Sequence, residues 1–211
     1  VDADEDASYA MANSQARGKA SSLMIDDVVA LYVDPRGPYP GLVYEWFDER
    51  RDATKYKGPW PVVAHPPCGP WSTMRHLSRE TTSHLAPDAL LAVRAFGGVL
   101  EHPRGSTFFR AYDLPLPGEP PDRWGGFTIE VNQCDWGHVA RKATWLYIVG
   151  VPRDALPPRP APRTPTHWAS GSRGQTSRRG SPVPPGIKVC SAEQRRRTPP
   201  AFASWLLEIA Q

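Results

Sequence analysis

The run PDALLAVRAFGGVLE at residues 87–101 decides the fold class, because it places a helix directly before a strand. Proline suits the first helical position, the aspartate after it suits the first turn, and the two glycines suit a helix end. We therefore predict a helix over Pro87–Phe96. Val99–Glu101 is a short apolar run that His102-Pro103 ends, and we predict a buried strand there.

Further apolar runs of strand length lie on both sides of this unit. The first, VVALYV, is rich in β-branched residues and is stopped by an Asp-Pro-Arg-Gly-Pro turn. Strands that alternate with helices are typical of an α/β domain with a mostly parallel sheet, which is the fold class that we predict. The other predicted strands are Val28–Val33, Leu42–Asp48, Pro61–Ala64, Thr128–Asn132 and Trp145–Val149.

Composition divides the chain into four parts. Residues 1–25 lack periodicity and are predicted to be a flexible leader, and residues 26–150 hold the predicted catalytic α/β domain. Residues 151–197 are rich in proline, arginine, serine and glycine, and are predicted to be a basic loop without a folded domain. Residues 198–211 are predicted to form a final helix that packs on the catalytic domain.

The final helix is amphipathic. Thr198 is its expected N-cap and Pro199 its expected first residue. Its apolar residues recur at the helical spacing of three and four, at Phe202, Trp205, Leu206 and Ile209.

Charge is distributed unevenly along the chain. The net charge is +3, but residues 151–200 hold nine arginines and one lysine against two acids, or +8. A basic segment of this kind suggests a polyanionic partner, although a solvated loop would have the same composition. The 25 prolines among 211 residues indicate that much of the chain is loop.

Composition also excludes some classes of protein. No apolar run approaches the length of a membrane span, and the acidic start differs from a secretory signal. Three cysteines cannot all pair within one chain, so we interpret them as thiols in a reducing compartment. We therefore expect a cytoplasmic protein with no membrane partner.

Two residues that could take part in catalysis lie at the ends of predicted strands. Cys68 lies on a loop stiffened by three prolines after Pro61–Ala64, and Glu101 ends the next strand. Ligands of open α/β sheets bind beyond the carboxyl ends of the strands. A thiol held near a carboxylate suits covalent catalysis with proton transfer. The alternatives are a small buried thiol and a surface or ion-paired carboxylate.

The sequence around these two residues resembles the cytosine-C5 DNA methyltransferases. PPCGPWS at residues 66–72 is similar to that family's Pro-Pro-Cys loop, and VLEHP at residues 99–103 to its strand ending in Glu-Asn-Val. DWGHVARK at residues 135–142, before a strand that ends at Gly150, is similar to a block with an aromatic-Gly pair and a Gln-x-Arg-x-Arg segment. The three blocks occur in the family's order over residues 61–150.

The resemblance implies a reaction and a role for each matching residue. Cys68 would add to C6 of a flipped pyrimidine, Glu101 would protonate or hydrogen-bond to N3, and Arg141 would help to bind the base and the oxyanion. The base must leave the duplex stack for this chemistry. The other residues expected at the substrate are Pro66, Pro67, Ser72, His102 and Lys142.

The resemblance also implies a cofactor, S-adenosyl-L-methionine, and a Rossmann-like sheet of the methyltransferase type. In the family a Phe-x-Gly-x-Gly loop after the first strand binds this cofactor. Here that loop is YVDPRGP at residues 32–38, in which two prolines lack N–H donors. The sheet is expected to be reduced by one strand–helix unit. The acids that could bind the ribose are Asp34, Glu45 and Asp48.

These observations predict a DNA pyrimidine C5-modifying enzyme, a cytosine-C5 methyltransferase-like transferase of a bacterium or phage-infected cell. Its substrate would be DNA or a pyrimidine nucleotide. The family's target-recognition domain would fall where residues 151–197 lie, so a protein partner is expected to supply target recognition.

Three other functions stay open at this stage. The enzyme could modify C5 without S-adenosylmethionine, as in phage base hypermodification, or it could be a catalytically inactive descendant that binds nucleic acid. A zinc-binding module is the third, because two histidines and two cysteines have plausible zinc spacing. Those four residues are His65, Cys68, Cys134 and His138.

Overall fold

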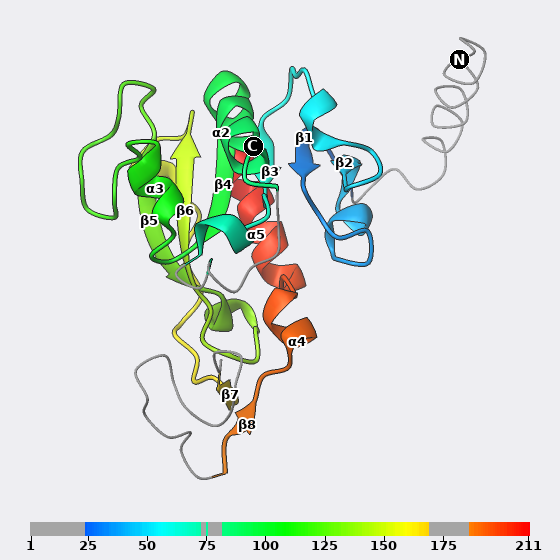
Figure 1. Cartoon of the computed structure of the whole chain (residues 1–211), viewed down its shortest axis with the longest axis vertical. Coiled ribbons are helices and arrows are strands. Elements are labelled where there is room, and N and C mark those ends of the chain that lie inside the picture. Colours follow the sequence, from blue (N-terminus) through cyan, green and yellow to red (C-terminus); the bar gives the residue numbers. More distant parts are fainter. Residues whose placement is uncertain (1–23, 73–74, 76–81, 169–185) are drawn as a thin grey trace, which may run out of the picture.

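The computed structural model describes residues 24–72, 75, 82–168 and 186–211 (Figure 1). Six strands form one sheet in the order β2-β1-β3-β4-β6-β5. The first four are parallel to one another, whereas β6 is antiparallel to both of its neighbours. The fold is therefore α/β with a mostly parallel sheet, compatible with a Rossmann-like fold. The strands are β1 (Ile25–Leu31), β2 (Val43–Phe47), β3 (Val62–Ala64), β4 (Gly98–Pro103), β5 (Phe127–Asn132) and β6 (Ala143–Val149).

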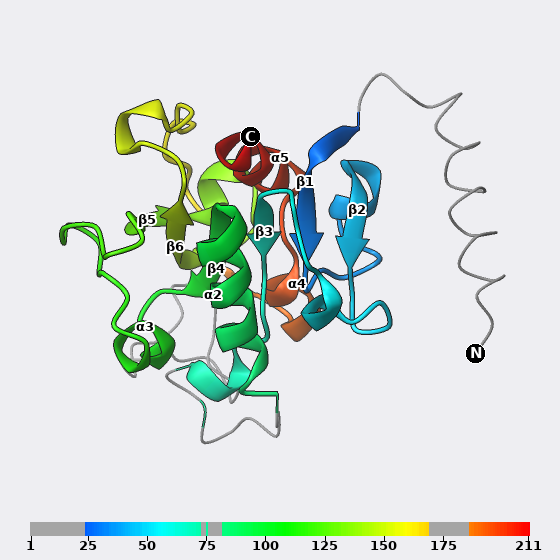
Figure 2. The ribbon, with the colours of Figure 1, turned by 90° about the horizontal axis from the view of Figure 1, so that it is seen from above.

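Helices cover both faces of this sheet, and Figure 2 shows β3 between α2 and α5. One face carries α2 (Leu85–Phe96) and the short α3 (Thr107–Ala111), and the other carries α5 (Pro200–Ala210). The central strands are buried on both sides, which explains their continuous apolar sequences. In β1, for example, Val28 belongs to the apolar cluster under α5, and Val29 to the cluster under α2.

The two glycines at the end of α2 have separate roles. Gly97 is the C-cap, as predicted, and its N–H donates to the carbonyl of Val93. Gly98 has φ +107°, and a Cβ at this position would collide with the carbonyl oxygen of Val62 in β3. Gly98 therefore permits the close approach of β3 and β4.

The loops that carry the predicted chemistry leave the sheet at one edge. Parallel pairing brings the carboxyl ends of β1, β3 and β4 together. β5 has the same direction as β4, because both are antiparallel to β6, so the loop 133–142 also lies at this edge. β2 and β3 lie on opposite sides of β1, and this reversal of strand order marks where ligands of open α/β sheets bind.

Two helix starts differ from the predictions. α2 begins two residues before Pro87, where proline is tolerated because the N–H groups of the first turn have no partner within the helix. α5 begins at Pro200 with Pro199 as its N-cap, so Thr198 is not the cap and Pro199 is not the first residue. The ring of Pro200 keeps Pro199 extended, at φ −61° and ψ 139°.

Residues 151–197, predicted as a loop, contain the short helix α4 (Ala192–Arg196). The side chains of Ser191 and Gln194 each accept a hydrogen bond from the other's backbone N–H, which is a capping box. The two-residue strands β7 (His167–Trp168) and β8 (Lys188–Val189) pair with each other nearby. The prediction of a continuous loop was therefore wrong for these stretches.

The start of the chain is described only in part. Of the predicted leader, residues 1–23 lie outside the described residues, and Ile25 already belongs to β1. No helix among the described residues is long and apolar enough to cross a membrane.

We expect Leu206→Ala to lower the free energy of unfolding by about 2–5 kcal/mol, because Leu206 is fully buried between α5 and the sheet. Leu91→Ala is the matched control: Leu91 is 64% exposed on α2, so its truncation should cost below about 0.5 kcal/mol. Urea unfolding of both variants measures the difference. Equal losses would contradict the packing of α5 on the sheet.

Candidate functional site

The carboxylate of Glu101, at the carboxyl end of β4, is the centre of the candidate site. Glu101 and Val99 lie on the same face of β4, the face that α5 covers. Only 12% of the Glu101 side chain is exposed. Its Oε2 accepts a hydrogen bond from His65 Nδ1 at 3.2 Å, and its Oε1 accepts one from Gln133 Nε2 at 3.0 Å. Two donors from other elements thus hold this carboxylate.

His65 connects Glu101 to the loop after β1. It is the first residue after β3, and its backbone N–H donates to the carbonyl of Leu31 in β1 at 3.0 Å. Its ring lies between Glu101 and Tyr39, whose hydroxyl oxygen is 2.6 Å from His65 Nε2. Tyr39 begins a 3-10 turn between β1 and β2 and is 2% exposed. The site therefore combines side chains from the segments after β1, β3 and β5.

Gln133 holds Glu101 from the other side. It follows β5 and is fully buried, and its Nε2 donates to Glu101 and to Thr144 Oγ1, each at 3.0 Å. The Thr144 hydroxyl in turn donates to the carbonyl of Lys142 at 3.2 Å, so its oxygen is free to accept from Gln133. This fixes the amide with its N–H groups toward Glu101, and the Gln133 Oε1 has no hydrogen-bond partner among the described residues.

These contacts set the protonation states. Burial raises the pKa of Glu101, but the hydrogen bond from His65 and the nearby positive charges, first that of Lys142, bring this pKa down to about 2. Burial raises the pKa of Tyr39 well above its usual value. Burial lowers the pKa of His102 to about 4, although the charge of Glu101 opposes this. At neutral pH Glu101 is ionised, Tyr39 is protonated and His102 is neutral.

Cys68 lies on a loop that is fixed at both ends. It is half-buried, and the carbonyl of Cys68 accepts a hydrogen bond from the N–H of Trp71 at 3.1 Å in a 3-10 turn. The carbonyl of Trp71 accepts from the hydroxyls of Ser106 at 3.3 Å and Thr107 at 3.1 Å, at the start of α3. The loop after β3 thus carries the thiol at the same edge of the sheet as Glu101.

The other predicted residues of this loop shape its backbone. Pro66 is buried and Pro67 is half-buried. Ser72 is half-buried, and its hydroxyl donates to the carbonyl of Gly69 at 3.3 Å. All three belong to the support of Cys68.

His102 is not brought together with Glu101, contrary to the prediction that both face the substrate. Consecutive strand residues point to opposite faces, so His102 lies on the α2 and α3 side. It is fully buried against Phe108, and its Nδ1 is 2.7 Å from Ser106 Oγ. Its Nε2 has no hydrogen-bond partner in the part of the chain that the structure describes. Through Ser106 it supports the start of α3 and, by way of the carbonyl of Trp71, the loop of Cys68.

Lys142 and Arg141 differ in their relation to Glu101. Lys142 is half-buried, its charge lowers the pKa of Glu101, and its Nζ donates to the carbonyl of Arg197 at 3.3 Å. Arg141 is exposed, and its charge acts instead on the buried thiol of Cys134. Of the two predicted cations, Lys142 is the one electrostatically coupled to Glu101.

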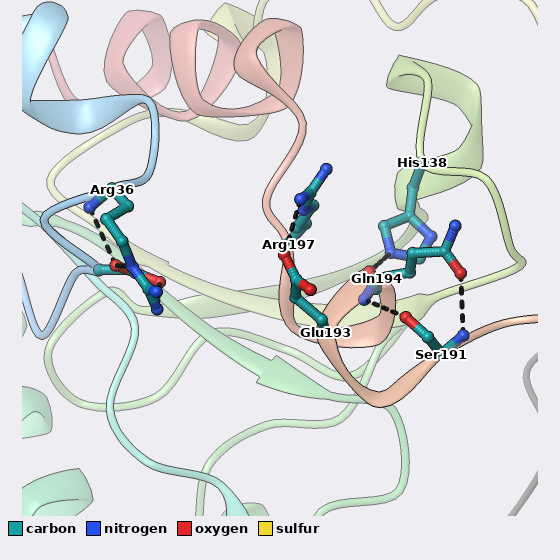
Figure 3. A network of polar contacts seen from close by, with 7 residues as sticks. Arg36, His138, Ser191, Glu193, Gln194 and Arg197 are labelled. Carbon is teal, nitrogen blue, oxygen red and sulfur yellow. Dashed lines mark hydrogen bonds and ion pairs between the residues drawn. The ribbon is translucent and has the colours of Figure 1, made fainter.

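α4 lies beside these loops (Figure 3). His138, in the loop after β5, is buried and its Nε2 donates to the carbonyl of Gln194 at 2.9 Å. Arg197 forms an ion pair of 2.7 Å with Glu193, and the charge of Glu193 also acts on Arg36 in the loop after β1. α4 therefore contacts the loop after β5, at the edge where Glu101 lies, and its Glu193 lies near the loop after β1.

Of the three acids expected to bind a cofactor ribose, two have other hydrogen-bond partners and the third lies away from the strand ends. Asp34 is exposed and pairs with Arg36, through the backbone N–H at 2.9 Å and the guanidinium at 3.3 Å. Asp48 is buried, and its Oδ1 accepts two backbone N–H groups of the following turn at 3.1 and 2.9 Å. Glu45 is exposed in the middle of β2, away from the strand ends.

The loop after β1 also lacks the features of a nucleotide site. Between β1 and β2 there is a 3-10 turn and no α-helix, so this connection supplies no helix N-terminus to a nucleotide. Pro35 and Pro38 contribute no N–H donors, and the buried Tyr39 extends to His65. The residues present do not fit S-adenosylmethionine in the position that the resemblance implies.

The four residues of the zinc hypothesis are described and do not form a ligand set. Nowhere in the described part of the chain do three or more His, Cys, Asp or Glu side chains gather in a metal-binding arrangement. His65 contacts Tyr39 and Glu101, and both ring nitrogens of His138 contact backbone groups. Cys68 and Cys134 are not joined by a disulfide.

The sequence analysis did not assign Tyr39, His65 or Gln133 to the site around Glu101, and it named His65 only as a possible zinc ligand. His65 and Gln133 each directly follow a strand, and that position was the available signal. Tyr39 had no comparable signal, because an aromatic residue in a proline-rich loop does not reveal a partner that is distant in sequence.

No protein-family model matches this chain, and no curated protein matches it. The resemblance to cytosine-C5 DNA methyltransferases therefore depends on the three sequence blocks, which the fold brings to one edge of the sheet.

We expect Glu101→Gln to flatten the acid dependence of stability. Because the folded-state pKa of Glu101 lies below its ordinary value of 4.5, the ionised group stabilises the fold above about pH 4.5, and this is lost as the pH falls toward 2. The loss amounts to roughly 3 kcal/mol. Urea unfolding from pH 6 to pH 2 measures it.

The control for this experiment is Glu208→Gln, since Glu208 is exposed on α5. This variant should keep the wild-type dependence on pH. An unchanged acid dependence in the Glu101 variant would show that the carboxylate is not held as described.

Proposed function

We propose that this protein is a pyrimidine C5-modifying enzyme acting on DNA, with Cys68 as the nucleophile and Glu101 as the group that faces N3 of the base. The observation that carries the proposal is the common position of the two residues. Cys68 lies in the loop after β3, and Glu101 lies in the carboxyl half of the neighbouring parallel strand β4, next to the point where the strand order reverses. Glu101 is ionised and is held by two hydrogen bonds. It is therefore a preorganised polar group of the kind that active sites contain.

The residue types match the chemistry. The Cys68 thiolate would form a bond to C6, and the electron pair of the C5–C6 double bond would move toward C5 and N3. N3 becomes basic in this step and takes up a proton from water, and the ionised Glu101 carboxylate, held by His65, would accept a hydrogen bond from the resulting N3–H. The same proton returns to water when the thiol is eliminated. C5 takes up an electrophile, or a proton from water, and loses its original proton. The C6–S bond then breaks and regenerates the thiol.

We assign no step to S-adenosylmethionine, because the loop after β1 does not fit it. Without a donor the same addition and elimination exchanges the hydrogen at C5 with water, and this partial reaction is balanced by solvent alone. The misfit between the loop after β1 and S-adenosylmethionine supports the donor-independent form of the hypothesis over methyl transfer. A thiol nucleophile also requires the reducing conditions of a cytoplasm.

Exposed cations near the site support DNA as the substrate. Arg141, in the loop after β5, and Arg196, in α4, are exposed and form no salt bridge with any described carboxylate. Lys142, in the same loop as Arg141, donates to the carbonyl of Arg197, and its charge lowers the pKa of Glu101. Such groups bind phosphates without reading sequence, so recognition of a particular target would come from a partner protein.

We expect the wild-type protein to release tritium from C5-tritiated cytosine in single-stranded DNA, with no added donor. Cys68→Ala should abolish this release, because no other group forms the C6 bond. Glu101→Gln should slow it by about 100-fold or more, since the neutral amide has no negative charge to stabilise the protonated N3. Scintillation counting of the released water measures the rate.

The matched control is Cys134→Ala, which removes a buried thiol whose pKa is raised by burial. Its rate should equal that of the wild type. Release that persists in Cys68→Ala, or that the Cys134 variant loses equally, would show that Cys68 is not the nucleophile.

We expect the double variant Arg141→Gln, Arg196→Gln to bind a single-stranded oligonucleotide with a weaker dependence on salt. Each lost phosphate contact lowers the slope of log K against log salt by about 0.7, so the slope should fall by about 1.4. Arg110→Gln is the control, because Arg110 is exposed on α3, on the other face of the sheet. Fluorescence anisotropy from 50 to 200 mM salt measures both slopes, and equal slopes in the double variant and the wild type would exclude this surface.

A further inference from the structure

Tyr39, His65 and Glu101 form a continuous hydrogen-bonded chain that ends at the candidate site. The hydroxyl of Tyr39 is 2.6 Å from His65 Nε2, and His65 Nδ1 is 3.2 Å from Glu101 Oε2. Only 12% of the side chain of either His65 or Glu101 is exposed, and Tyr39 is 2% exposed. The rings of Tyr39 and His65 also pack together, with their centroids 5.2 Å apart. The chain is therefore largely shielded from water.

The partners at its two ends determine where the ring proton of His65 lies. Glu101 is ionised, so it can only accept, and the nitrogen that faces it must carry a proton. The Tyr39 hydroxyl keeps its proton, since burial raises its pKa, and donates it to the other nitrogen. Neutral His65 thus has its proton on Nδ1 and accepts at Nε2. A tyrosine at Nε2 selects this tautomer in the way that second partners orient ligating and catalytic histidines.

Both donors on Glu101 are needed to hold it at the end of β4. An ionised carboxylate of this burial is costly unless it is hydrogen-bonded. Gln133 holds Oε1 from the loop after β5, and His65 holds Oε2 from the loop after β3. Removing the His65 contact would raise the pKa of Glu101 and would leave Oε2 free to rotate away from the base.

We propose that Tyr39 and His65 are positioning residues of this enzyme: Tyr39 fixes the Nδ1-protonated tautomer of His65, and His65 orients Glu101 toward N3 of the pyrimidine. This inference rests on the proposed function for the identity of the base, but the arrangement of the three residues does not depend on it. The inference also assigns a function to the loop after β1, which is not a glycine-rich cofactor loop. This loop supplies Tyr39, so the position of the loop affects the orientation of the Glu101 carboxylate through His65.

The test uses Tyr39→Phe, which keeps the buried ring and removes the hydroxyl. Imidazole ¹⁵N chemical shifts report which ring nitrogen is protonated, and His65→Gln assigns the His65 signals by deleting them. In the wild type we expect Nδ1 protonated and Nε2 unprotonated. In Tyr39→Phe we expect a mixture of both tautomers, and tritium release from C5 should fall at least about tenfold in kcat with KM unchanged.

The pKa of Glu101 provides a second measurement, by ¹³C NMR of labelled glutamate with Glu101→Gln for assignment. His65→Gln should raise this pKa by at least one unit. Tyr147→Phe is the matched control, because Tyr147 is a buried tyrosine that donates to Asp122 at 2.7 Å in the cluster under α2. It should change neither the His65 tautomer nor the pKa of Glu101.

The outcomes separate this inference from the proposed function. A proton on Nε2 of His65 in the wild type, or a pKa of Glu101 that His65→Gln leaves unchanged, overturns the inference even if C5 exchange occurs. The expected tautomer and pKa shift, in a protein that releases no tritium, support the positioning of Glu101 and overturn the C5 chemistry. A rate loss in Tyr39→Phe with an unchanged tautomer shows that Tyr39 acts only through packing, and it also overturns the inference.

Discussion

The hydrogen bond from His65 to Glu101 is the interaction on which the site depends. It joins two residues 36 positions apart, and it forms because β3 and β4 are neighbouring parallel strands whose carboxyl ends lie together. A half-enclosed carboxylate would otherwise be protonated or turned toward water, because burying an unpaired charge is costly. The second donor, Gln133, comes from the loop after β5, so the antiparallel insertion of β6 between β4 and β5 is part of the same arrangement.

The final helix, α5, covers a face of the sheet that the connection between β1 and β2 leaves uncovered. The connection from β1 to β2 has no α-helix to cover the sheet, and α5 covers that face instead, with Phe202 and Leu206 fully buried in the same apolar cluster as Tyr39. Because α5 covers this face, the loop after β1 does not need to cover it. It can place Tyr39 over the strand ends, where a larger Rossmann-like domain would have a helix and its phosphate-binding turn.

The sequence predicted the parts of this structure that depend on local patterns. The apolar runs gave the six strands, and the two glycines after α2 correctly marked its end. Local patterns also contained the capping box of α4, which the proline-rich composition of its surroundings concealed. The hydrogen bonds of the site could not be predicted in this way. Gln133 is the residue after β5, but its contact with Glu101 depends on the strand order, which no short segment specifies.

Consecutive side chains of β4 point to opposite faces of the sheet, so Glu101 and His102 have different surroundings. Glu101 faces the α5 side, where Lys142 and the loops after β1 and β5 are polar, and its pKa is lowered. His102, the next residue, faces the apolar side, where burial keeps it neutral beside Phe108 and Ser106. The same β4 segment therefore fixes the Cys68 loop from one face, through Ser106 and the carbonyl of Trp71, and presents the carboxylate on the other. Because α2 and α5 cover the two faces of the sheet, the Glu101 carboxylate and the Cys68 loop are both reached from the edge at the carboxyl ends of the strands.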